Sequence, residues 1–198
     1  STTLFPYTTL FRSVISFAGG TPDAALFPVE QIAEVTAQIF ANPALRRECL
    51  QYGISEGYAP LREVIARYMG RRRIEARAGD VLITCGSQQG LEFVGKLFVN
   101  PGERILVTRP TYLGALQAFS LCEPRFVPLP QDAQGIDLNA LERELAVGAR
   151  FLYLVPDFAN PTGLSLSLEN RRSVVELARR HRVPIVEDQA YEALAYDE

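Results

Sequence analysis

The sequence contains little lysine and cysteine and no long apolar run. Lys96 is the only lysine among the 20 basic residues of the 198-residue chain, and all the others are arginines. The three cysteines, Cys49, Cys85 and Cys122, are odd in number and lack the spacing of metal ligands, so we expect no metal site and a reduced, cytoplasmic setting. No apolar stretch reaches the roughly 20 residues that cross a bilayer, and the start lacks the basic region of a signal peptide. The net charge of -3 provides no basic surface, so the sequence indicates neither a nucleic-acid nor a membrane partner.

The first thirteen residues differ from the rest of the chain. The tetrapeptide TTLF occurs at 2–5 and again at 8–11, and no helical or strand period continues from there. Two interpretations stay open: a segment that is not native to the fold, or an ordinary N-terminal arm. We therefore divide the chain into a non-native or disordered arm at 1–13, an N-terminal segment at 14–59 and the first part of a larger domain at 60–198.

Most of the chain alternates between helical and strand patterns. Proline opens two helices, at Pro28 and Pro60, and continuously apolar runs are typical of buried strands. The patterns predict strands at 81–84, 105–108, 126–129, 151–155 and 184–187, and helices between them at 91–99, 112–121, 138–147 and 168–181. This order predicts an α/β fold with a mainly parallel sheet and helices on both faces. Ligands in such folds bind at the carboxyl ends of the strands.

The loops after the first two predicted strands carry candidate binding groups. Gly86 allows a tight turn, while Ser87 and Gln88 open the next helix, whose free N–H groups suit a phosphate. Tyr112 follows the second strand, where an aromatic ring can stack on a planar ligand. Each feature also has an ordinary explanation, as a capped turn or a half-buried tyrosine.

The loops after the last two predicted strands add an amide, an acid and a phenol. Asn160 precedes a proline, which restricts the backbone of Asn160 to a stiff turn and thereby fixes the direction of its amide. Asp188 ends an apolar strand, where a carboxylate is costly unless a cation or a hydrogen-bond donor pairs with it, and Tyr191 follows three residues later. A structural turn and an exposed strand-end acid are the alternatives. Together, the four loops suit a phosphorylated, planar and basic heterocycle.

The same motifs carry a family resemblance. The order YG, GSQQGL, PTY, NPTG and EDQAY, over about residues 14–198, resembles the fold-type I aminotransferases of class I and II. It is most similar to their bacterial 2-aminoadipate and broad-specificity group. The resemblance implies pyridoxal 5′-phosphate as cofactor and an incomplete large domain of that fold. It also implies transamination between an amino acid and a 2-oxo acid in the complete parent protein.

The resemblance assigns a role to each candidate residue. It implies that Asp188 pairs with the pyridine nitrogen of the cofactor, that Asn160 and Tyr191 bind its 3-oxygen, and that Tyr112 stacks on its ring. Gly86, Ser87 and Gln88 match the loop that binds the phosphate. Tyr52 matches a tyrosine that reaches the phosphate of the neighbouring subunit, which implies a homodimer, and Gly20 matches a segment on the substrate side.

The resemblance also shows what we expect this chain to lack. The family's catalytic lysine follows a later strand, beyond Glu198, so we assign no catalytic residue and expect an N-terminal fragment without appreciable activity. Lys96 cannot replace it, because it lies within the predicted helix at 91–99 and is expected to be a surface lysine.

Other functions stay open as alternatives. Other fold-type I enzymes, such as lyases, share these loops. A MocR-type regulator with an aminotransferase-like domain requires a basic helix-turn-helix upstream, and residues 1–13 are unsuited to DNA contact. A doubly wound nucleotide-binding protein lacks support, because the first loop has neither a G-x-G-x-x-G nor a G-x-x-x-x-G-K-[ST] motif.

Overall fold

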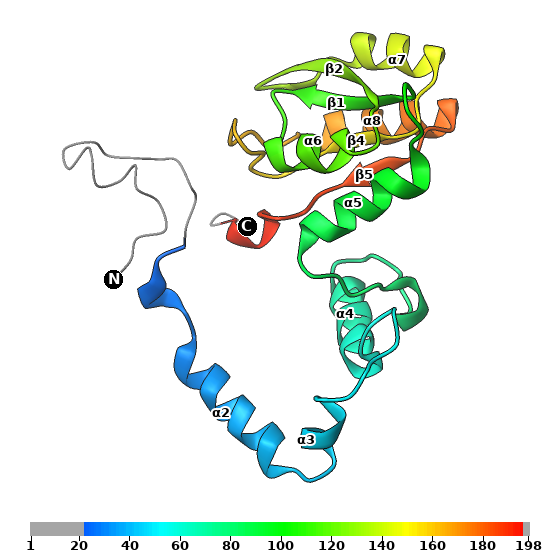
Figure 1. Cartoon of the computed structure of the whole chain (residues 1–198). Helices are drawn as coiled ribbons and strands as arrows, with labels where there is room; N and C mark the ends of the chain where they lie inside the picture. Colours follow the sequence, from blue (N-terminus) through cyan, green and yellow to red (C-terminus); the bar gives the residue numbers. More distant parts are fainter. Residues whose placement is uncertain (1–21, 196–198) are drawn as a thin grey trace, which may run out of the picture. The chain divides into compact units, whose positions relative to one another are not determined.

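The computed structural model describes residues 22–195 and divides the chain into two compact units, residues 1–54 and 55–198 (Figure 1). The predicted arm at 1–13 and Gly20 lie outside the described residues, and the predicted boundary between residues 59 and 60 stays a prediction. None of the described helices is both long and apolar enough to span a membrane.

The first unit is helical where it is described. It contains a 3-10 turn, η1 (Ala24–Leu26), and the helices α2 (Val29–Ala41) and α3 (Leu45–Glu48). Helix α2 begins directly after Pro28, as predicted, because the fixed φ of proline suits a helix start. Its apolar side chains remain exposed: Val29, Ile32 and Val35 keep between 54% and 59% of their surface.

The second unit begins with helix α4 (Ala59–Arg71), the turn η2 (Ala78–Asp80) and helix α5 (Ser87–Phe98). The Arg62 side chain donates to the Ala78 carbonyl from Nε and from Nη2, at 2.9 and 2.7 Å, which joins α4 to η2. The strand predicted at 81–84 is wrong. The backbone at Val81 is extended, but the described residues offer no strand to pair with, and the Ile83 N–H donates to the Glu56 carbonyl instead.

The five-stranded sheet has the order β3-β2-β1-β4-β5. Its strands are β1 (Arg104–Arg109), β2 (Arg125–Asp132), β3 (Gly135–Ile136), β4 (Leu152–Leu154) and β5 (Ile185–Glu187). All neighbouring pairs are parallel except β2 and β3. Between the strands run α6 (Leu113–Ser120), α7 (Leu138–Val147) and α8 (Leu168–His181), and the turn η3 (Glu192–Leu194) follows β5. The mainly parallel sheet is confirmed, with the predicted helices close to their expected positions.

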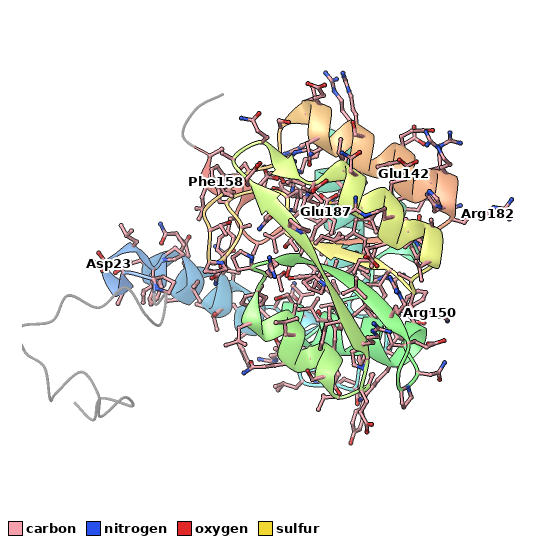
Figure 2. The ribbon with its side chains drawn as sticks, turned by 90° about the horizontal axis from the view of Figure 1, so that it is seen from above. Asp23, Glu142, Arg150, Phe158, Arg182 and Glu187 are labelled. Carbon is pink, nitrogen blue, oxygen red and sulfur yellow. The ribbon has the colours of Figure 1, made fainter. Side chains whose placement is uncertain are left out.

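Helices cover both faces of the sheet, as predicted. Along β1, Leu106 joins a buried cluster with residues of α7 and α8, whereas Ile105 and Val107 join a second cluster with residues of α5 and α6. The same alternation occurs along β4, because successive side chains of a strand point to opposite faces. In Figure 2, the orange helix α8 and the green helix α6 lie on opposite sides of the strands.

Strand β3 depends on one buried amide from α8. Asn170, only 8% exposed, accepts a hydrogen bond from the Ile136 N–H at 3.1 Å and donates one to the Ile136 carbonyl at 3.0 Å. The approach requires glycine at position 135, where a Cβ would lie 2.4 Å from the Asn170 Cγ and φ is +123°. The sequence did not reveal this antiparallel strand, because two residues are too few for a period.

We expect Asn170→Ala to destabilise the chain by about 2 kcal/mol, because it leaves the buried N–H and carbonyl of Ile136 without partners. Urea unfolding monitored by circular dichroism measures the change. Asn139→Ala, on the exposed side of α7, is the control and should stay within about 0.5 kcal/mol of the parent chain. Equal stability of both variants would contradict the role of Asn170.

Candidate functional site

Three of the predicted loops lie at one edge of the sheet. Strands β1, β4 and β5 are parallel neighbours, with Val107 beside Tyr153 and Leu154 beside Glu187. The loops that follow them therefore leave from the same edge. In Figure 2, Phe158, in the loop after β4, lies at the opposite end of the sheet from Arg150, which precedes β4.

Asp188 is held at this edge by two hydrogen bonds to β4. Its backbone N–H donates to the Leu154 carbonyl at 3.0 Å, and its carboxylate oxygen Oδ2 accepts from the Tyr153 hydroxyl at 2.8 Å. Tyr153 is fully buried in the middle of β4, with its ring edge-on to Phe119 at 5.5 Å between centroids. Burial first, and then the negative charge of Asp188, raises the pKa of the Tyr153 phenol well above its usual value. The phenol thus stays protonated at neutral pH and is the donor of this bond.

Two further tyrosines surround this pair. Tyr112 and Tyr191 are half-buried and pack against the cluster that contains Tyr153, and both contribute to the raised pKa of its phenol. Tyr112 precedes the first residue of α6, and its ring folds back over Gly114, where a Cβ would lie 2.5 Å from the ring atom Cζ. Glycine at position 114 therefore lets the Tyr112 ring lie against the start of α6. The structure brings together three of the residues named from the sequence and one from the core: Tyr112, Asp188 and Tyr191 with Tyr153.

The predicted phosphate loop lies at the N-terminus of α5. Gly86 precedes the helix with φ of +78°, a backbone conformation that glycine adopts without strain. Ser87 and Gln88 form the exposed first turn, and the Gln88 side chain donates to the Gly114 carbonyl at 2.9 Å. This bond joins the start of α5 to the start of α6, next to Tyr112. The partial positive charge of the helix N-terminus and its free N–H groups suit an anion at this place.

The loop that carries Asn160 is closed by its own hydrogen bonds. The Leu166 N–H donates to the Pro156 carbonyl and the Ala159 N–H donates to the Leu164 carbonyl, both at 2.9 Å. Ala159 is buried in the same cluster as Tyr153, whereas Asn160 itself is exposed. No hydrogen bond of the described residues joins Asn160 to Asp188, so its place in the site stays a prediction.

Arg171, at the start of α8, holds the two ends of this loop together. Its guanidinium donates to both oxygens of Asp157, at 3.1 and 2.5 Å, to the Pro156 carbonyl at 3.2 Å and to the Leu166 carbonyl at 2.8 Å. The bond to Asp157 raises the pKa of the Arg171 guanidinium, which therefore keeps its positive charge. A forked guanidinium with a half-buried carboxylate fixes the geometry of the loop.

Residues 12–198 match the family model for aminotransferase class I and II. The chain belongs to this family. It is 44% identical over 186 residues to a 2-aminoadipate transaminase of Thermus thermophilus, with 93% of this chain and 45% of that protein covered. It is 40% identical over 190 residues to the aromatic-amino-acid aminotransferase 1 of Thermococcus litoralis, with 92% of this chain and 45% of that protein covered.

A solved structure agrees with these relatives. LysN, an α-aminoadipate aminotransferase of Thermus thermophilus complexed with N-(5'-phosphopyridoxyl)-L-leucine, matches with a TM-score of 0.85 and 43% identity over 97% of this chain and 48% of LysN. The aminotransferase chain thus spans about half the length of the relatives that it matches.

Three predicted positions are not brought into the site by the described contacts. Tyr52 lies in the first unit with 99% of its surface exposed, and Gly20 lies outside the described residues. Their roles, like that of Asn160, stay predictions. Lys96 is an exposed residue of α5 that pairs with Glu92 at 2.5 Å, in agreement with the predicted surface lysine.

Sequence reasoning missed Tyr153 and Arg171. A signal for Tyr153 existed, because a phenol in the middle of an otherwise apolar strand requires a hydrogen-bond partner. For Arg171, one of several arginines along the helical pattern of α8, the sequence offered no distinguishing signal.

We expect Arg171→Leu to open the loop at residues 156–166, because the half-buried Asp157 loses its partner. Backbone amide hydrogen exchange in that loop should become at least about tenfold faster, since charge-assisted hydrogen bonds contribute about 1.5–3 kcal/mol. Exchange of the loop peptide followed by mass spectrometry measures the change. Arg172→Leu, at the exposed neighbouring position, is the control, and equal exchange in both variants would contradict the role of Arg171.

Proposed function

We propose that this chain is the cofactor-binding part of a pyridoxal-phosphate-dependent aminotransferase, which transfers an amino group from an amino acid to a 2-oxo acid. Family membership and the names of the similar proteins support this activity. The relatives are about twice as long, so the proposed activity belongs to a protein that includes the matching second half.

The residues at the sheet edge fit the cofactor chemically. Asp188 is half-buried, and among the hydrogen bonds of the described residues only its Oδ2 has a side-chain partner, so Oδ1 remains available to a ring N–H. The exposed N-terminus of α5 with Ser87 suits the phosphate, and the half-buried ring of Tyr112 suits the face of a pyridine. In this proposal, Gly86 and Gln88 complete the phosphate loop, and Asn160 and Tyr191 bind the ring oxygen.

The observation that carries the proposal is the carboxylate of Asp188, fixed by Tyr153 at the carboxyl end of β5. Bound pyridoxal phosphate supplies an electron sink for the negative charge that develops on the substrate. Asp188 stabilises a proton on the ring nitrogen, because an opposite charge nearby favours the protonated form. Tyr112 orients the ring, and the α5 N-terminus holds the phosphate against movement.

The described residues contain no candidate for the covalent attachment of the cofactor. Lys96 lies nine residues after Ser87, about 13 Å along α5, and is paired with Glu92. We therefore propose that the region matching the second half of the relatives supplies the lysine. We also propose a cytoplasmic homodimer in which Tyr52, almost fully exposed here, binds the phosphate in the neighbouring subunit. The free cysteines Cys49, Cys85 and Cys122 are compatible with that reduced compartment.

The alternatives have less support. The two aminotransferases reported above are 44% and 40% identical to this chain, whereas similar proteins that are named as HTH-type transcriptional regulators are 28–30% identical. The net charge of -3 offers no basic surface for DNA.

The test uses the complete protein, with amino acids as donors and 2-oxo acids as acceptors. We expect amino-group transfer that depends on added pyridoxal phosphate, and a decrease in kcat/KM of at least about 100-fold in Asp188→Ala, because the ring nitrogen loses its charge partner. Chromatography of the amino acid products measures the transfer.

Glu169→Ala, an exposed acid of α8, is the control and should leave kcat/KM unchanged. Release of ammonia without a new amino acid would identify a lyase. Activity in Asp188→Ala equal to that of the parent protein would contradict the proposed site.

A further inference from the structure

The side chain that holds Asp188 lies in the hydrophobic core and is not one of the residues assigned from the family motifs. Tyr153 is fully buried in β4, with its ring edge-on to Phe119 in the cluster between the sheet, α5 and α6 that also contains Phe151. Its hydroxyl emerges from that cluster at the position of Asp188, at 2.8 Å from Oδ2. Because its ring is fixed in the core, this phenol holds a carboxylate at the edge of the sheet in one place.

The partner of Asp188 is neutral. Among the salt bridges of the described residues none involves Asp188, and Arg72, which donates to the neighbouring Gln189, is paired with Glu192. A guanidinium in place of the phenol would neutralise the carboxylate. A phenol donates a hydrogen bond and leaves the full negative charge available to a second partner.

The groups around this hydrogen bond keep the proton on the phenol. Tyr112 and Tyr191 are the other titratable side chains that act on Tyr153, and they raise its pKa further in the same direction as burial and Asp188. The donor therefore does not transfer its proton to the carboxylate.

We propose that Tyr153 is a positioning residue of the cofactor site, which binds one oxygen of Asp188 and thereby directs the other oxygen to the ring nitrogen of the cofactor. This inference rests on the proposed function. A side chain without this bond rotates about its last torsion and is hydrated, and the alignment of Oδ1 then costs free energy when the cofactor binds.

Two ligands, used as probes, distinguish a Tyr153 that positions Asp188 from a Tyr153 that only supports the fold. Pyridoxamine 5′-phosphate binds without a covalent bond, and an analogue in which CH replaces the ring nitrogen keeps the phosphate, the ring face and the ring oxygen. Only the first probe offers an N–H to Asp188. The experiment measures the dissociation constants of both probes with the complete apoprotein, for the parent protein and the variants Tyr153→Phe, Tyr153→Met, Asp188→Ala and Asp188→Glu.

We expect Tyr153→Phe to weaken the binding of pyridoxamine phosphate by about tenfold and that of the analogue by less than about twofold, since one hydrogen bond to a charged group is lost. Phenylalanine keeps the ring contacts of Tyr153 in the core. Asp188→Glu moves the carboxylate that pairs with the ring nitrogen and should also show a selective loss. Tyr153→Met, a second variant that lacks the hydroxyl and has a flexible side chain to fill the space, decides the matter if Tyr153→Phe does not fold.

Tyr68→Phe, which removes a phenol from the exposed face of α4, is the matched control and should change neither constant. An equal loss for both probes in Tyr153→Phe, or no loss while Asp188→Ala remains selective, would overturn the positioning role and leave the proposed function intact. If Asp188→Ala does not distinguish the two probes, the proposed function itself is wrong, and this inference fails with it.

Discussion

The free-energy cost of a half-buried carboxylate at the end of β5 determines the arrangement of the candidate site. Asp188 lies where β5 leaves the sheet, and an unpaired anion in such a place is unfavourable. The Tyr153 phenol donates to the carboxylate and offsets this cost, while the backbone N–H of Asp188 donates to the Leu154 carbonyl and holds the residue beside β4. Both partners belong to β4, so the acid is stable only if β4 and β5 pair in the observed register.

The same parallel pairing organises the rest of the site. Because β1, β4 and β5 are neighbours, the residues that follow them share one edge, and Tyr112, Tyr153, Asp188 and Tyr191 come together there. The start of α5 is joined to this group by the hydrogen bond from the Gln88 side chain to the Gly114 carbonyl. No strand of the sheet precedes α5 in the described chain. The contacts between helices α5 and α6 thus replace the strand that was predicted at 81–84.

The loop of Asn160 illustrates a second way to fix a candidate side chain. Its rigidity comes from Arg171 and Asp157, a charge pair between α8 and the loop, and from bonds across the loop itself. Tyr153 bonds a residue of a family motif, and Arg171 bonds residues on either side of one. In the proposed site, the motifs supply the side chains for the ligand, while the core and α8 provide the residues that hold them.

Local patterns in the sequence were sufficient for the types of element and for most of the candidate site. Apolar runs, helical periods and the prolines at 28 and 60 predicted the helices and four of the strands, and the motifs at the strand ends named Tyr112, Asp188 and Tyr191. These signals succeed because strand burial, helix starts and turns depend on residues that are close in the chain.

Only the tertiary structure decided which strands pair, which apolar faces are buried and which donor meets Asp188. Residues 81–84 lack a neighbouring strand within the described chain, and the apolar side chains of α2 stay exposed although their spacing is ideal for burial. Tyr153 and Asp188 are 35 residues apart, so their hydrogen bond exists only after β4 and β5 have become neighbours. The sequence by itself thus determined the elements and the chemistry at their ends, and the packing of distant segments determined how that chemistry is held, because hydrogen bonds and burial require contacts in space.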